Sequence, residues 1–186
     1  PIKSSAASDV YKRQAYIGMD AVLKNYEDCF VLCDGVQKLD EELTVFSAVP
    51  GRELWSGAND TLREKIGEDY PRDTFRHEQD LLVTENGKTA LFAGCAHCGI
   101  VNILKSAEDV LGRAPDAVFA GFHLYNPSLG KSEPDALVDA VGEKLRGDKV
   151  AHYFTGHCTG KEAYERLKRK LGDRLGEMPA GSDFTV

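Results

Sequence analysis

Three short apolar segments of this chain each end in a glycine that is followed closely by a histidine. Their length and their branched or aromatic content predict buried strands over residues 89–93, 117–120 and 150–155. The histidines that follow them are His97, His123 and His157. Glycine lets the backbone turn sharply at a strand end, and ligands collect at that edge of an α/β sheet. The pattern therefore predicts an α/β sheet with three histidines at one edge.

The second half of the chain alternates between strand and helix patterns. Apolar residues recur on one helical face over residues 100–111, which predicts a helix there. Helices are also expected over 134–145, where Pro134 suits the first turn, and over the charged segment 161–171. With the three strands they give a β-α-β-α-β-α order, which is typical of a layered α/β sheet. Asn86 and Gly87 lie between the apolar runs 80–84 and 88–93 and predict a tight hairpin.

The first half of the chain has weaker patterns. We expect a short helix over residues 15–25, strands over 29–33 and 43–49, and a long loop with a helical turn over 51–72. Residues 1–14 are small and polar and show no periodicity. We therefore treat 1–14 as a non-native or disordered leader and 15–186 as the folded region.

Composition limits the classes of function. The chain has 186 residues, enough for one domain or a large part of one, and a net charge of −7, which does not favour a nucleic-acid partner. No apolar stretch approaches the roughly 20 residues of a membrane span, so we expect no membrane partner. The cysteine count of five is odd, and the first 14 residues lack the apolar middle of a signal peptide. We expect a reducing, cytoplasmic setting without a disulfide framework.

The strand-end histidines are candidate metal ligands. Imidazole binds zinc, iron and manganese, so His97, His123 and His157 predict a divalent metal, with zinc first and manganese or iron as alternatives. His123 lies between two apolar neighbours and could instead belong to a half-buried wall. His152 lies inside a predicted strand, where we expect a structural role.

Other reactive side chains lie close to these histidines in the sequence. Cys95 and Cys98 form a Cys-x-x-Cys pair, and Cys158 directly follows a candidate ligand. A thiol-redox function is one alternative, because this spacing at the start of a helix lowers thiol pKa values. We expect instead that the three cysteines surround the metal site, together with His77 and Glu78, which precede a predicted strand.

Four segments together resemble the metallo-β-lactamase superfamily. They are FRHE at 75–78, GCAHCGIVNIL at 94–104, GFHL at 121–124 and TGHCTG at 155–160. The resemblance runs from about residue 29 to the end of the sequence. Within the superfamily it is greatest for the branch that includes dihydropterin–ribofuranosylaminobenzene-phosphate synthase.

This resemblance implies a fold and a metal centre. The superfamily fold is an αββα sandwich with the metal at one edge between the two sheets. By position, His97 and His157 resemble metal ligands of the second half of that fold. His123 falls where many relatives carry a bridging aspartate, and a histidine there is usual for this branch.

One family motif is missing from the sequence. The His-x-His-x-Asp-His motif supplies most of the metal ligands in the superfamily, yet no histidine precedes His77. The resemblance therefore implies the C-terminal half to two-thirds of a metal-dependent hydrolase or synthase that acts on a small molecule, with a pterin or a phosphate ester as candidates. We expect this chain alone to be inactive and to expose an apolar sheet face. The alternatives are a non-catalytic binding domain on the same scaffold and a thiol-redox protein that uses Cys95 and Cys98.

Overall fold

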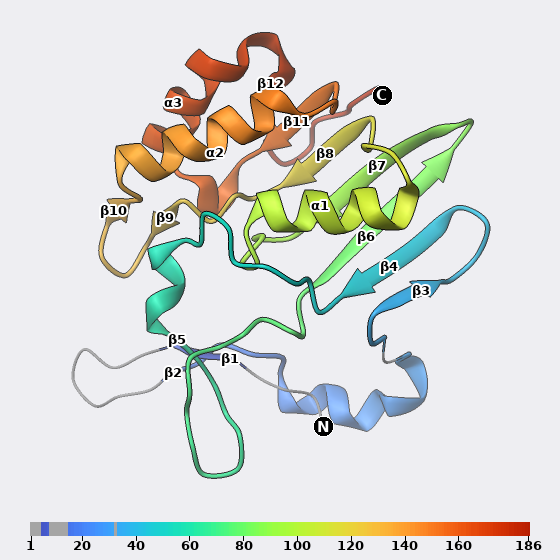
Figure 1. The fold of residues 1–186 in the computed structure, drawn as a ribbon. Coiled ribbons are helices and arrows are strands. Elements are labelled where there is room, and N and C mark those ends of the chain that lie inside the picture. The colour runs from blue at the N-terminus through green and yellow to red at the C-terminus, as the bar shows by residue number, and fades with distance from the viewer. Residues whose placement is uncertain (1–4, 8–14, 32) are drawn as a thin grey trace.

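A seven-stranded mixed sheet forms the centre of the computed structural model, which describes residues 5–7, 15–31 and 33–186 (Figure 1). The order of its strands is β12 (Leu175–Glu177), β11 (His152–Thr155), β8 (Ala117–Ala120), β7 (Lys88–Ala93), β6 (Gln79–Glu85), β4 (Leu43–Ser47) and β3 (Val36–Lys38). The four strands from β12 to β7 run parallel, and the others pair antiparallel. The carboxyl ends of β7, β8 and β11 consequently share one edge of the sheet.

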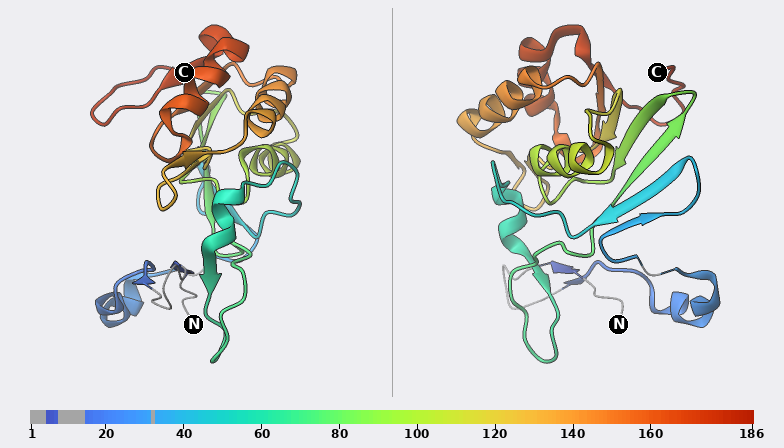
Figure 2. Two further views of the ribbon diagram at one scale, coloured as in Figure 1. Left: turned by 90° about the vertical axis from the view of Figure 1, so that its left-hand side faces the viewer. Right: turned by 45° about the vertical axis from the view of Figure 1, so that its right-hand side comes forward.

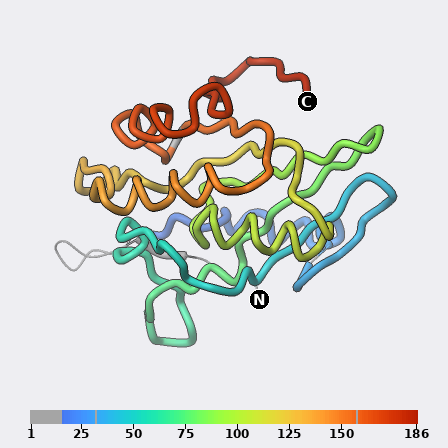
Figure 3. The backbone as a smooth tube through the Cα atoms, turned by 45° about the horizontal axis from the view of Figure 1, so that its top comes forward, coloured from blue at the N-terminus to red at the C-terminus, as the bar shows by residue number. Residues whose placement is uncertain are grey.

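A layer of helices connects the parallel strands. It consists of α1 (Ile100–Leu111), α2 (Asp135–Gly147) and α3 (Lys161–Leu171). Figure 2 shows α1 and α2 on one side of the sheet, and in Figure 3 the three helices run side by side, with α2 in contact with both others. None of the helices in the described residues is long and apolar enough to span a membrane.

The core lies between the helices and one face of the sheet. Leu91, Val118, Tyr153 and Leu175 stand in register on neighbouring strands and are completely buried. They join one apolar cluster with residues of all three helices, among them Ile103, Leu145 and Leu167. The apolar residues of each helix therefore face the sheet.

The opposite face of the sheet carries an aromatic row. Phe92, Phe119 and Phe154 are also in register, and Phe119 stacks on both neighbours at ring-centroid distances of 4.9 Å. Phe184, near the end of the chain, packs on Phe119 and Phe154, whereas Phe92 remains 40% exposed. This face of the sheet is therefore partly exposed at Phe92.

Smaller elements lie outside the main sheet. A three-stranded sheet has the order β2 (Ala15–Tyr16), β1 (Ser5–Ala7) and β5 (Leu62–Glu64), and a hairpin is formed by β9 (Tyr125–Asn126) and β10 (Lys131–Ser132). The short 3₁₀ helices are η1 (Ala21–Cys29), η2 (Gly57–Thr61), η3 (His157–Thr159) and η4 (Gly172–Arg174).

The predicted α/β class is confirmed, and most elements of the second half form where expected. Helices 100–111 and 161–171 have the predicted bounds, and the hairpin turn uses positive φ angles at Asn86 and Gly87. The first half differs. The expected helix over 15–25 forms later, as η1, and the described part of 29–33 contains no strand, because short apolar runs do not distinguish helix from strand. The leader prediction for 1–14 stays a prediction, since only 5–7 are described there.

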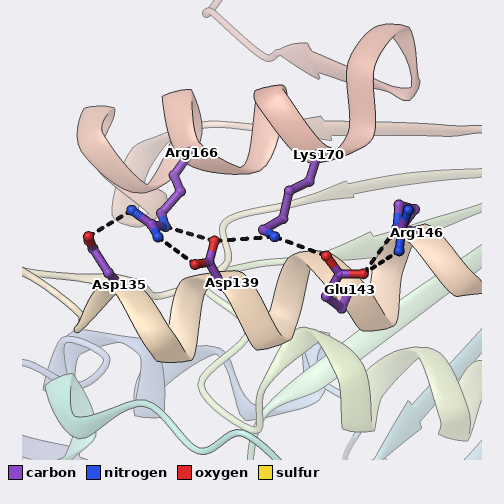
Figure 4. Close-up of polar contacts among 6 residues, drawn as sticks. All are labelled: Asp135, Asp139, Glu143, Arg146, Arg166 and Lys170. Atoms are coloured by element: carbon purple, nitrogen blue, oxygen red, sulfur yellow. Dashed lines mark hydrogen bonds and ion pairs between the residues drawn. The ribbon is translucent and has the colours of Figure 1, made fainter.

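An ion-pair network joins α2 to α3 (Figure 4). Arg166 donates two hydrogen bonds to Asp139 and a third to Asp135 at 2.7 Å, and Lys170 bridges Asp139 and Glu143. Hydrogen bonding from Arg166 lowers the pKa of Asp139 to about 2. The network therefore holds together two helices whose apolar faces already pack on the sheet.

Replacing Arg166 by Met should lower the urea midpoint of unfolding. Because the pKa of Asp139 is lowered in the folded state, the ion pair adds to the free energy of unfolding at pH values above the ordinary carboxyl pKa. This contribution is lost as the pH falls toward about 2. The difference between wild type and variant should shrink at low pH and in high salt. Arg169→Met, an exposed change on the same helix, is the control. Equal effects of the two variants would show that the network does not stabilise the helix pair.

A buried carboxyl group interrupts the apolar core beside Phe46 and Ala93 of the neighbouring strands. Asp80 on β6 is 1% exposed, and neither of its carboxyl oxygens has a hydrogen-bond partner among the residues that the structure describes. Burial, and secondarily the charge of Glu78, raises the pKa of Asp80 to about 8. The group is therefore protonated in the folded protein at neutral pH, while it ionises in the unfolded chain.

Asp80→Asn should flatten the pH dependence of stability. Because the pKa of Asp80 is raised in the folded state, its contribution to the free energy of unfolding is complete at low pH. This contribution is lost as the pH rises from about 4 to about 8, and the loss is at most on the order of 5 kcal/mol. The variant should therefore gain in unfolding free energy relative to wild type as the pH rises, measured by urea titration. Asp69→Asn, at an exposed site, should follow the wild-type curve. Parallel curves for wild type and Asp80→Asn would contradict the assignment.

Candidate metal centre

His97 and His123 lie against each other at the edge of the sheet. Their ring centroids are 4.1 Å apart, with the rings inclined at 55°. His97 follows β7 and His123 follows β8, so the parallel pairing of these strands brings together residues from separate turns. The chain bends sharply there, with positive φ angles of 55° at Ala96 and 48° at His123. Left-handed backbone at non-glycine residues is costly and tends to occur at functional sites.

Asn59 fixes the orientation of the His97 ring. Its amide nitrogen donates to the His97 carbonyl at 2.8 Å, so its Oδ1 faces His97 Nδ1 at 3.0 Å. Since Oδ1 can only accept, Nδ1 carries a proton in this contact, and in the neutral ring the lone pair is then on Nε2. A second hydrogen-bonding partner of this kind is what metal-binding histidines commonly have. Asn59 is 3% exposed, so the contact is shielded from solvent.

Ser56 and Glu133 hold the backbone of His123. The Ser56 hydroxyl lies 2.7 Å from the His123 carbonyl and 3.0 Å from Glu133 Oε1. Glu133 also accepts from the Ala58 amide at 2.7 Å. Ser56 precedes η2, and Asn59 lies within it. One short segment therefore positions both histidines.

An aromatic wall borders His97. The Phe75 ring stacks on the His97 ring at 4.6 Å, nearly parallel at 6°, and Phe75 is 1% exposed. Trp55 packs on Phe75 at 5.8 Å, and the Arg52 guanidinium lies over the Trp55 ring. This wall shields one side of the His97 ring from water.

Glu78 and His77, both predicted to lie near the site, make different contacts. Glu78 accepts hydrogen bonds from the backbone amides of His97 at 2.6 Å and Cys98 at 2.7 Å. Its carboxylate therefore holds the turn that leads into α1, at the end of the helix that favours negative charge. His77 packs instead on Phe75 and lies 3.7 Å from an Asp73 oxygen, with about a third of its side chain exposed.

The three nearby cysteines separate into two environments. Cys98 is 1% exposed and its thiol faces the Phe75 carbonyl at 3.6 Å; burial, and then Glu78, raises its pKa. The thiol of Cys158 donates to the Cys95 carbonyl at 3.4 Å. Hydrogen bonding to the Cys95 side chain, and then burial, raises the pKa of Cys158. Cys95 is thus adjacent to Cys158, a residue from a different turn.

The third predicted ligand cannot be placed in the same way. His157 begins η3, directly after β11 and Gly156, but its side chain lies outside the described residues. Its convergence with His97 stays a prediction. Among the side chains that the structure does describe, no group of three or more His, Cys, Asp or Glu residues could hold a metal ion. His152 is exposed and stacks on Phe154, on the aromatic face of the sheet.

Sequence reasoning missed the residues that position the histidines. Asn59, Ser56 and Glu133 come from segments that show no periodicity. For residues 51–72 the sequence predicts a long loop with a helical turn, and η2 is that turn. The sequence signal for this segment is Ser56 before Gly57, because serine is typical of a helix N-cap. Contacts over 38 residues (Asn59 to His97) or 67 residues (Ser56 to His123) leave no trace in local patterns.

Comparison with known proteins identifies the type of fold. No protein-family model matches the chain. Over 101 residues, 54% of this chain, it is 30% identical to 7,8-dihydropterin-6-methyl-4-(beta-D-ribofuranosyl)-aminobenzene-5'-phosphate synthase of Methanocaldococcus jannaschii, and the match spans about a third (32%) of that relative. The crystal structure of a metal-dependent hydrolase of the beta-lactamase superfamily matches all of this chain and 68% of its own, with a TM-score of 0.78 and 20% identity. The predicted resemblance is therefore confirmed, and the chain has a metallo-β-lactamase-like fold.

Proposed function

We propose that the chain contributes to the metal centre of a metal-dependent enzyme of the metallo-β-lactamase type, with His97, His123 and His157 as ligands. The contact between the His97 and His123 rings carries this proposal, because it joins two turns that are distant in sequence. The fold of the metal-dependent hydrolase and the sequence of the synthase support it. The proposed metal is a divalent cation, zinc first, with manganese or iron as alternatives.

The side chains present suit an imidazole-bound metal. In the neutral ring, the Asn59 contact places the lone pair of His97 on Nε2, and neutral imidazole is the form of histidine that ligates metals. His123 is 7% exposed and adjacent, which suits a second imidazole ligand. The described residues thus offer two imidazoles, and the proposal assigns the third to His157.

Chemistry at the proposed centre divides between the metal and the chain. A bound divalent cation would polarise a substrate oxygen and lower the pKa of bound water. Asn59 would orient the His97 ring, Phe75 would exclude water from one side of it, and Glu78 would hold the backbone of the same turn. These contacts fix the ring before any metal binds, which reduces the entropy lost on binding.

The ligand set within this sequence is small. It contains no His-x-His-x-Asp-His motif, so we propose that metal binds weakly to this chain and that the chain alone has no turnover. The similar synthase is named for a dihydropterin phosphate product. A pterin or a phosphate ester is accordingly our proposal for the substrate class of the complete enzyme.

Metal content of histidine variants tests the proposal. The zinc bound at equilibrium, measured by dialysis against a buffer that contains zinc, should fall in His97→Ala, His123→Ala and His157→Ala. His152→Ala, an exposed change on β11, should retain the wild-type amount. Hydrolysis of a generic phosphodiester should stay at background for all of them.

Two results would contradict this account. Equal zinc content in all four variants and the wild type, or none in any, would favour the non-catalytic binding domain. Metal-dependent turnover by the chain itself would show that other residues complete the site.

A further inference from the structure

Cys95 and Cys158 meet above a single glycine. Cys95 follows β7 and Cys158 lies in η3 after β11, while Gly121 directly follows β8, the strand between them. A Cβ atom at Gly121 would lie 2.5 Å from Cys158 Sγ and 3.6 Å from Cys95 Cα. The absence of a side chain at Gly121 therefore provides the space that the Cys158 thiol fills.

The backbones that carry these two cysteines are held by hydrogen bonds. The Gly121 amide donates to the Gly94 carbonyl at 2.8 Å, which fixes the residue before Cys95. On the other side, the Thr159 hydroxyl accepts from the Phe122 amide at 2.9 Å and bonds to Thr155, which fixes the residue after Cys158. The Cys158 thiol then donates to the Cys95 carbonyl, and the two side chains are hydrogen-bonded. Their separation is thus set by the sheet.

Cys98 is the sequence-based partner of Cys95, but its environment differs. Its thiol faces the Phe75 carbonyl, and the residue belongs to the apolar core under α1. The amide of Cys98 is held by Glu78. A Cys95–Cys98 disulfide would require the thiol of Cys98 to leave this core.

We propose that Cys95 and Cys158 are a reversible redox pair that closes to a disulfide beside the candidate metal centre. The oxidant is a low-molecular-weight disulfide. One protein thiol, as thiolate, attacks it and releases one small thiol; the second protein thiol then attacks the mixed disulfide, forms the Cys95–Cys158 bond and releases the other. Two protein thiols are oxidised, one small disulfide is reduced to two thiols, and the two protons are transferred to those products.

Each cysteine of this pair is close in sequence to a candidate ligand. Cys95 precedes His97 by two residues, and Cys158 directly follows His157. A bond between them would tie the turn after β7 to the turn after β11 across β8. The proposal goes beyond the proposed function and does not depend on it, because the crosslink can form whether or not a metal binds.

Disulfide mapping tests the pair directly. The folded chain is equilibrated with oxidised glutathione, its remaining thiols are alkylated, and its proteolytic peptides are identified by mass. Cys29→Ser and Cys33→Ser in the same chain remove the two cysteines outside the site. The result expected is a peptide crosslinked between Cys95 and Cys158, lost on adding excess reduced glutathione, with Cys98 recovered as a thiol.

Two further variants make the test specific. Cys98→Ser should leave the crosslink intact, and Cys158→Ser should abolish it without producing an equal yield of Cys95–Cys98. Should Cys158→Ser fail to fold, the mapping of the Cys98→Ser and parent chains still decides. A Cys95–Cys98 crosslink as the main product, or only glutathione adducts on Cys95 and Cys158, would overturn the proposal.

Discussion

Ala93, Ala120 and Thr155 stand side by side where three parallel strands end, and each is followed by a glycine. This register constrains everything at the site. Because β7, β8 and β11 stop at the same level, the three turns after them start from one line along the sheet edge. His97 and His123 meet there, and so do the thiols of Cys95 and Cys158. The repeated order of strand, glycine and reactive side chain thus brings residues that are distant in sequence to one edge of the sheet.

The turns after β7 and β8 set the positions of His97 and His123 but not the orientations of their side chains. A second segment of the chain fixes those orientations. Residues 56–59 cross the edge of the sheet and contact both histidines, through the Ser56 hydroxyl and the Asn59 amide. Glu133, just before α2, holds this segment in turn. The turns that carry these histidines have positive φ angles at Ala96 and His123. The rings are therefore oriented by the chain itself.

The sequence predicted the regular part of this arrangement because regular structure has local periodicity. The helices 100–111 and 161–171, the Asn86-Gly87 turn and the strand-end positions of the histidines all follow from patterns a few residues long. The role of Asn59 and the pairing of Cys95 with Cys158 depend on chain segments brought together by the sheet. The Cys-x-x-Cys spacing suggests Cys98 as the partner of Cys95. In the structure, Cys98 is instead buried in the apolar core. Contacts of this kind become visible only once the register is known.

Nitrogen-15 NMR of the histidine rings, recorded during titration with zinc, tests the central claim most directly. Before zinc is added, His97 should show the tautomer protonated at Nδ1, as the Asn59 contact requires. Zinc should then shift the ring resonances of His97, His123 and His157 together, at one stoichiometry, and leave His152 unchanged. An Nε2-protonated His97, or zinc shifts confined to one of the three histidines, would contradict a shared metal site.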